Sequence, residues 1–293
     1  MNEIRVNFRP LIKEMEFLGK KLSMSRLTGE NSSPFAQKDV EFEEFKPFSY
    51  GDDVHTIDWK ASLRCNKLLI RKAIQRRNYN IFFLVDVSES MLYSTGDKLK
   101  CEYAAELVAA LSHYFLTHSE SVGVALFNEK MVSVIPPNLG NNQFMKITSA
   151  LSSARNYGGG FGLSHVLRRV ESLLLPNSVV IIVSDFLGLD KNWKKAVEGA
   201  CRRFDVRALI IRDAQDLSLN DRIGMAVVED PFSSRKMLVD LVTAKESYDR
   251  NAKRQLEDVQ RAFLKYRGDS LLLKTSDAFV RPVMKFFSKR AWQ

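Results

Sequence analysis

Two short groups of oxygen-bearing side chains are the residues in this sequence best suited to chemistry. Asp86 ends an apolar run, and Ser88 and Ser90 follow it at alternate positions, while Ser184 and Asp185 end a later apolar run. If these runs are neighbouring strands of one parallel sheet, their ends lie together at the edge where ligands bind. Carboxylates and hydroxyls offer only oxygen ligands, which suit a hard divalent ion such as Mg²⁺ better than Zn²⁺. A purely structural role, as Asx and Ser turns that cap the following helices, fits the same residues.

Several other chemistries fit the sequence less well. A haloacid-dehalogenase phosphatase needs a second aspartate two residues after the first, where this chain has Ser88, and no GxxxxGK[ST] phosphate loop occurs. The stretch 157–162 (YGGGFG) precedes a predicted helix and would offer backbone amides to a phosphate, but Leu163 stands where GxGxxG ends in glycine. We therefore expect a tight backbone loop there. The histidines form no HExxH pattern and the three cysteines no metal-binding spacing, which argues against a zinc hydrolase and favours reduced, structural thiols.

The strands and helices that position these groups are predicted from hydrophobic periodicity. From Asn80 onward, apolar runs alternate with amphipathic stretches, which is typical of buried parallel strands covered by helices. The predicted fold class is α/β, with a doubly wound, mostly parallel sheet. We expect strands at 81–86, 121–128, 131–137, 178–185, 206–212, 225–228 and 270–274, and helices at 97–117, 143–153, 163–174, 192–204, 244–266 and near the C-terminus.

The composition limits the class of protein. The 293 residues are 45% hydrophobic and 27% charged, as in a globular protein, and 44 basic against 35 acidic residues give a net charge of +9. No apolar run is long enough for a membrane helix, and the start of the chain lacks the apolar core of a secretory signal. We therefore expect a cytoplasmic protein.

The charges are unevenly distributed in the first third of the chain. Residues 38–58 hold seven acidic and two basic side chains, whereas Lys60–Arg77 holds seven basic and no acidic ones and is predicted to form a basic strand. The simplest interpretation is that the two stretches pair within one subdomain. The alternative is that Lys60–Arg77 binds a polyanion, either a nucleic acid or a phosphate ester.

Two motif blocks give the chain a resemblance to known families. Residues 85–91 (VDVSESM), the Gly-rich loop 158–162 and residues 183–186 (VSDF) resemble the metal-ion-dependent adhesion site of von Willebrand factor A domains. Residues 41–72 resemble the domain-of-unknown-function-58 (DUF58) family, in which Gly-Asp-Asp, Ile-Asp-Trp and a following Arg recur. The resemblance implies a von Willebrand factor A-like domain over 79–293. It also implies a strand-rich N-terminal extension over 1–78 that packs against it and carries the motif residues Gly51, Asp52, Asp53, Asp58, Trp59 and Arg64.

The resemblance also implies a ligand set for Mg²⁺ or Mn²⁺. The hydroxyls of Ser88 and Ser90 would bind the ion, and Asp86 and Asp185 would act mostly through bound water. The position of the family's Thr holds Gly160, so one hydroxyl ligand is missing, and Ser164 or a water molecule would have to replace it. Such an ion would bind an Asp or Glu of a protein partner as its last ligand.

The function implied by the resemblance is non-enzymatic. The chain would be a protein-interaction module that works with a MoxR-type AAA+ ATPase in chaperone-like assembly or metal insertion. A scaffold that binds no ion is the alternative favoured by Gly160. For Asp52, Asp53, Asp58, Trp59 and Arg64 we expect internal ion pairing and packing rather than a second functional surface.

Overall fold

A six-stranded sheet forms the centre of the protein. The computed structural model describes residues 4, 6–27, 44–50, 52–72, 80–176, 178–220, 224–230, 232–233 and 235–288. The strand order is β10 (Asp269–Lys274), β7 (Asp205–Arg212), β6 (Val179–Ser184), β3 (Asn80–Asp86), β4 (Ser121–Phe127) and β5 (Met131–Asn138). All neighbours are parallel except β4 and β5, which form the predicted hairpin. The predicted α/β class with a mostly parallel sheet is confirmed.

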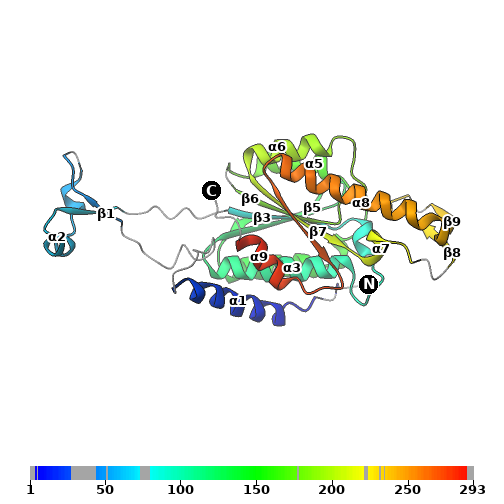
Figure 1. The fold of residues 1–293 in the computed structure, drawn as a ribbon, viewed down its shortest axis with the longest axis horizontal. Helices are drawn as coiled ribbons and strands as arrows, with labels where there is room; N and C mark the ends of the chain where they lie inside the picture. Colours follow the sequence, from blue (N-terminus) through cyan, green and yellow to red (C-terminus); the bar gives the residue numbers. More distant parts are fainter. Residues whose placement is uncertain are drawn as a thin grey trace.

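Helices cover both faces of this sheet, because its central strands are apolar on both sides. In β3, Phe83 and Val85 belong to one hydrophobic cluster, whereas Phe82 and Leu84 belong to the other. Figure 1 shows α1 (Arg9–Leu27), α3 (Lys100–Thr117) and α9 (Val280–Ser288) on one side of the sheet. The opposite side is covered by α5 (Leu163–Leu173), α6 (Trp193–Arg203) and α8 (Leu241–Lys265). The sheet is therefore doubly wound.

The remaining elements of the main body are short or peripheral. α4 (Asn141–Ser152) contributes Ile147 and Leu151 to the cluster beneath α3. Further pieces are η2 (Glu89–Leu92), η3 (Ala154–Asn156), α7 (Ala214–Leu217) and the two-stranded hairpin of β8 (Met225–Glu229) and β9 (Lys236–Asp240). None of the helices in the described part of the chain combines the length and the apolar character that a membrane crossing requires.

The N-terminal helix α1 was not predicted. It packs against α3 and α9, and its Met15 is buried in the same cluster as those helices. Phe17, by contrast, is 67% exposed. The inward-facing Leu11, Ile12, Met15 and Leu18 recur at helical spacing, so the signal for this helix was present in the sequence. Within the described part of the predicted extension 1–78, strands occur only in residues 44–72. The predicted domain boundary after residue 78 lies in the stretch 73–79, which is outside the described residues.

Residues 44–72 form a small unit of their own. β1 (Glu44–Pro47) pairs antiparallel with β2 (Leu69–Lys72), and η1 (Val54–Thr56) and α2 (Trp59–Cys65) lie between them in sequence. The prediction of one basic strand over 60–77 is wrong for its first part, which is helical. The cause is Asp58, whose carboxylate accepts hydrogen bonds from the amides of Lys60 (2.9 Å) and Ala61 (3.0 Å) and so caps α2.

Candidate functional site at the strand ends

The predicted site lies where the sheet changes its winding direction. β3 and β6 are parallel neighbours, with Val85 opposite Val183, and their carboxyl ends carry Asp86 and Asp185. From β3 the chain passes through α3 to β4 on one side, whereas from β6 it passes through α6 to β7 on the other. A switch point of this kind is where open α/β sheets bind ligands. The structure therefore brings the two predicted carboxylates to the expected edge.

Asp86 and the two serines form a buried group of hydrogen bonds. Asp86 Oδ1 accepts from the amide of Ser88 at 2.9 Å, and Asp86 Oδ2 accepts from the hydroxyl of Ser184 at 2.6 Å. The hydroxyls of Ser88 and Ser90 lie 3.2 Å apart and bond to each other. Burial, and after it the charge of Asp185, raises the pKa of Asp86 to about 7, although its hydrogen bonds with Ser184 and Ser88 act in the opposite direction.

Lys100 is a residue of this site that the sequence pattern did not reveal. Its side chain is 1% exposed, and its Nζ lies 2.7 Å from Asp185 Oδ2 and 2.9 Å from Asp216 Oδ2. The other oxygen of Asp185 accepts from the amide of Leu187 at 2.9 Å. Burial alone would lower the pKa of Lys100, but the charges of Asp185 and Asp216 outweigh it and raise that pKa. The site therefore contains a buried ammonium group paired with two carboxylates.

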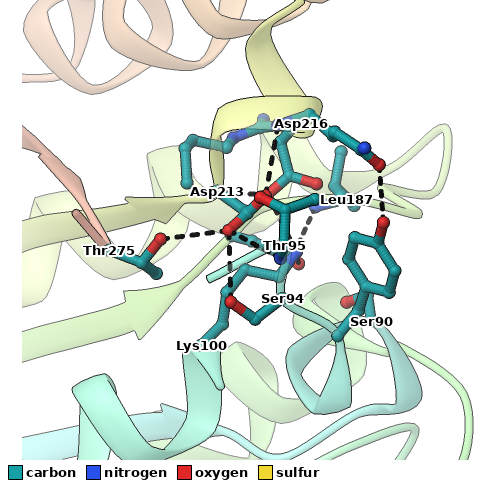
Figure 2. Close-up of polar contacts among 12 residues, drawn as sticks. Ser90, Ser94, Thr95, Lys100, Leu187, Asp213, Asp216 and Thr275 are labelled. Atoms are coloured by element: carbon teal, nitrogen blue, oxygen red, sulfur yellow. Dashed lines mark hydrogen bonds and ion pairs between the residues drawn. The ribbon is translucent and has the colours of Figure 1, made fainter. Parts of the chain in front are cut away.

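Asp213 joins the neighbouring strand ends. Figure 2 shows Thr275, Ser94 and Thr95 converging on its carboxylate, with the Thr275 hydroxyl 3.1 Å and the Thr95 amide 3.2 Å from Oδ2. The amide of Asp213 donates to Asp216 Oδ2 at 2.8 Å, and Asp216 in turn contacts Lys100. Together with the bond between Ser184 and Asp86, these contacts connect the ends of β3, β6, β7 and β10 without interruption.

Asp213 should make the stability of the folded protein depend on pH, with a loss of stability in acid. Burial would raise its pKa, but hydrogen bonds, first that of Thr95, hold it below 3.8. A depressed folded-state pKa adds stability above the ordinary pKa, and this stability is lost as the pH falls through the folded value. In urea unfolding, we therefore expect wild type to exceed Asp213→Asn in stability at about pH 6 and the difference to shrink towards about pH 3. A difference that stays constant with pH would contradict this role.

Two backbone amides of the Gly-rich loop donate hydrogen bonds to other groups of the protein. Gly158 N donates to the carbonyl of Val87 at 2.7 Å, and Gly160 N donates to Glu129 Oε2 at 2.5 Å. The carbonyl of Gly159 accepts from the amide of Glu89 at 2.9 Å. The loop is therefore a tight backbone structure fastened to the β3 end, as expected, and these two amides are already used. Gly160 stands at the Thr position and supplies no hydroxyl.

Ser164 is the predicted substitute ligand, and its hydroxyl is engaged elsewhere. It donates to Asp190 Oδ1 at 2.7 Å, and the same oxygen accepts from the amide of Asn192 at 2.7 Å, at the start of α6. Ser164 thus links α5 to the loop before α6. The contacts of the described residues give it a structural use and do not join it to Ser88 or Ser90.

The family-motif residues lie in the small unit, except Gly51, which is outside the described residues. Asp52 accepts from the amide of Ser49 at 2.9 Å and pairs with Lys46 at 3.5 Å, and Asp53 accepts from the amide of His55 at 3.0 Å. Asp58 caps α2, so the carboxylates of Asp52, Asp53 and Asp58 each accept hydrogen bonds from nearby backbone amides and stabilise the local backbone. Trp59 is 61% exposed, against the expectation that it packs, and Arg64, for which an internal ion pair was expected, is also exposed.

The predicted ligands suit a divalent ion only in part. The hydroxyl separation of 3.2 Å suits two adjacent ligands of an octahedral Mg²⁺, whose bonds of about 2.1 Å place neighbouring oxygens about 3 Å apart. Asp185, however, already holds Lys100 on one oxygen and the Leu187 amide on the other. The hydroxyls would fit an ion, but the charged part of the set does not.

Comparison with known proteins shows to which family the chain belongs. The model described as "Protein of unknown function DUF58" matches residues 44–258, which is more than half of the chain. The chain belongs to the DUF58 family. This confirms the family predicted from the motifs, and the matched range includes both the small unit and the strand-end site of this DUF58 protein.

Relatives of this DUF58 chain include the uncharacterized protein Rv1480 of Mycobacterium tuberculosis, which is 23% identical over 252 residues, 84% of this chain and 78% of the relative. The uncharacterized protein MAV169 of Mycobacterium avium is 27% identical over 126 residues, 42% of this chain and 71% of the relative. Among solved structures, BatB from Bacteroides thetaiotaomicron is similar with a TM-score of 0.46 and 13% identity, covering 72% of this chain and 98% of that one. The VWA domain of SpRpn10 is similar with a TM-score of 0.42 and 9% identity, and the match covers 70% of this chain and 93% of that one.

Proposed function

We propose that this DUF58 protein is a non-enzymatic protein-interaction module that binds a MoxR-type AAA+ ATPase. The pair would act in a chaperone-like way, assembling other proteins or inserting metal into them. The partner is inferred from the family resemblance. The binding surface is inferred from the structure, and the observation that carries the proposal is an exposed apolar hairpin beside the strand-end site.

The apolar hairpin consists of β8 and β9. Four of its side chains are more than half exposed: Met225 (61%), Val227 (63%), Met237 (68%) and Leu238 (62%). Val227 lies opposite Leu238 in the antiparallel pair, and Val228 lies opposite Met237. The first pair lies on one face of the hairpin and the second pair on the other, so both faces carry exposed apolar side chains, which mark contact sites for other proteins. A partner that covers the hairpin would account for its composition, whereas the fold alone does not require it.

The apolar hairpin is attached to the site described above. A Cβ on Gly188 would lie 2.7 Å from the ring of Phe232, so this ring, in the loop between β8 and β9, packs directly on the backbone of Gly188. Gly188 is three residues after Asp185, in the loop that leaves β6. The amide of Leu241 also donates to the carbonyl of Gly224 at 2.8 Å and closes the hairpin onto α8. A partner on the hairpin would therefore lie next to the strand-end loops.

The contacts of the serines favour binding over catalysis. A nucleophilic serine needs an adjacent general base. Ser88 and Ser90 instead share one hydrogen bond, and both are almost fully buried, with exposures of 0% and 2%. This arrangement supports a role in holding the loop at the end of β3.

Leu238→Asp should weaken ATPase binding at least tenfold, because a carboxylate placed in an apolar contact is left desolvated and unpaired. Binding is measured by interferometry with a purified MoxR-type ATPase from the same genome. Met145→Asp is the matched control, since Met145 is also exposed (62%) but lies on α4. Equal affinity of Leu238→Asp and wild type would remove the hairpin from the interface, and no binding by wild type would refute the proposed partner.

A further inference from the structure

We propose that the ammonium group of Lys100 takes the place of the divalent ion at the strand-end site, so that this DUF58 protein holds its site together and binds its partner without metal. The inference concerns the surface used in the proposed function. It rests, however, on the contacts of Lys100 and on the distribution of charge, both of which are independent of the identity of the partner.

The position of Lys100 is unfavourable for a cation in two respects. Lysine is almost never fully buried unless it is paired. Lys100 is also the first residue of α3, where the positive end of the helix dipole disfavours a cation. Both unfavourable effects are offset by the carboxylates of Asp185 and Asp216 at 2.7 and 2.9 Å. Its ammonium group thus lies against Asp185, one of the carboxylates predicted to serve a metal.

The charges around Lys100 leave little for a metal ion to neutralise. Arg212, at the end of β7, is 1% exposed, and its charge acts on Asp185 and Asp216. Its guanidinium donates to Gln255, whose amide donates in turn to the carbonyl of Phe186 at 2.6 Å. Lys100 therefore contacts both carboxylates directly, and Arg212 adds a second buried positive charge that acts on them. A divalent ion would add two positive charges, with Asp86 as the remaining predicted carboxylate ligand to offset them.

In the other half of the predicted metal site, each oxygen ligand has a hydrogen-bond partner in the protein. Both oxygens of Asp86 accept hydrogen bonds from the protein, and the hydroxyls of Ser88 and Ser90 share one hydrogen bond, in which one donates and the other accepts. The missing Thr hydroxyl at Gly160 and the use of Ser164 by Asp190 agree with this picture. The oxygen ligands are thus hydrogen-bonded to protein groups, and the charge of the ion is supplied by a side chain.

The first test is a titration of the full wild-type chain with Mn²⁺, followed by the electron paramagnetic resonance of free Mn²⁺, and with Mg²⁺ by calorimetry. We expect no binding up to millimolar concentration and no change in melting temperature. Binding of one ion per chain that Ser88→Ala abolishes would overturn the inference. This measurement uses the wild-type protein and so does not depend on the folding of any variant.

The second test replaces the cation. Lys100→Met leaves Asp185 and Asp216 without their partner and should lower the melting temperature by roughly 10 °C. Millimolar Mg²⁺ should restore at least half of this loss, whereas an equal ionic strength of NaCl should not. Lys98→Met is the matched control, since Lys98 also pairs with a carboxylate, Glu106 at 2.6 Å, but its side chain is 43% exposed. A Lys100→Met variant that Mg²⁺ does not stabilise more than it stabilises Lys98→Met would refute the exchange of cations.

The two proposals fail in different ways. If the MoxR-type ATPase binds but a chelator abolishes the binding, the inference about Lys100 is wrong and the proposed function stands. If the ATPase does not bind at all, the proposed function is wrong, while the Mn²⁺ titration still decides the role of Lys100.

Discussion

Replacing Asp185 by alanine should destabilise the protein by about 3 to 5 kcal/mol, because it leaves a buried ammonium with one carboxylate in place of two. Lys100 and Asp185 are 1% and 0% exposed, so water cannot substitute for the lost partner. The amide of Leu187 would lose its acceptor as well. The free energy of unfolding in urea measures this effect directly.

The matched control for this prediction is Asp190→Ala. Asp190 also accepts two hydrogen bonds, from Ser164 and from the amide of Asn192, but it faces no buried cation among the described residues, and its loss should cost about 1 kcal/mol. If Asp185→Ala costs no more than Asp190→Ala, the ion pair does not contribute as described. In a Lys100→Met background the cost of Asp185→Ala should fall, because the buried cation is then absent.

Gly162→Ala should cost about 3 kcal/mol and disturb the loop that supports the β3 end. A Cβ at this position would lie 2.6 Å from the carbonyl oxygen of Glu129 and 2.8 Å from its Cα, and backbone atoms cannot move aside as a flexible side chain would. The amide of Gly162 also donates to the carbonyl of Asn128 at 3.0 Å, so the displaced loop would lose this bond.

Gly96→Ala provides the comparison, since the nearest atom to its Cβ would be Ser94 Oγ at 3.8 Å, an ordinary contact. Urea unfolding of both variants, together with the near-ultraviolet circular dichroism of the folded proteins, distinguishes a local overlap from a general effect of losing glycine. Equal stabilities of the two variants would show that the loop yields without cost.

The elements from Asn80 onward could be predicted because burial on both faces gives β3, β4, β6 and β7 long apolar runs, which are typical of central parallel strands. The same pattern placed Asp86 and Asp185 together, since parallel neighbours end at the same edge. The small unit was harder to predict, because Asp58 starts a helix inside a stretch whose composition was interpreted as a strand. There a single hydrogen-bonding side chain decided the outcome.

Lys100 was missed because a lysine at the start of a helix is ordinarily taken to face solvent. The signal was present in the spacing: Lys100 precedes Ala104, Leu107 and Leu111 on the buried stripe of α3. A charged residue on the apolar face of a helix indicates a buried partner. Which partner it meets depends on how α3 packs over the ends of β6 and β7, and no local pattern contains that information.

The continuous connection between the ends of β3, β6, β7 and β10 has a mechanical consequence. A force applied to any one of these loops is shared by four adjacent strands, because each strand end is fastened to the next through buried polar bonds. An external pulling force would therefore act on the four strand ends together, and the strands would not separate from the sheet one at a time.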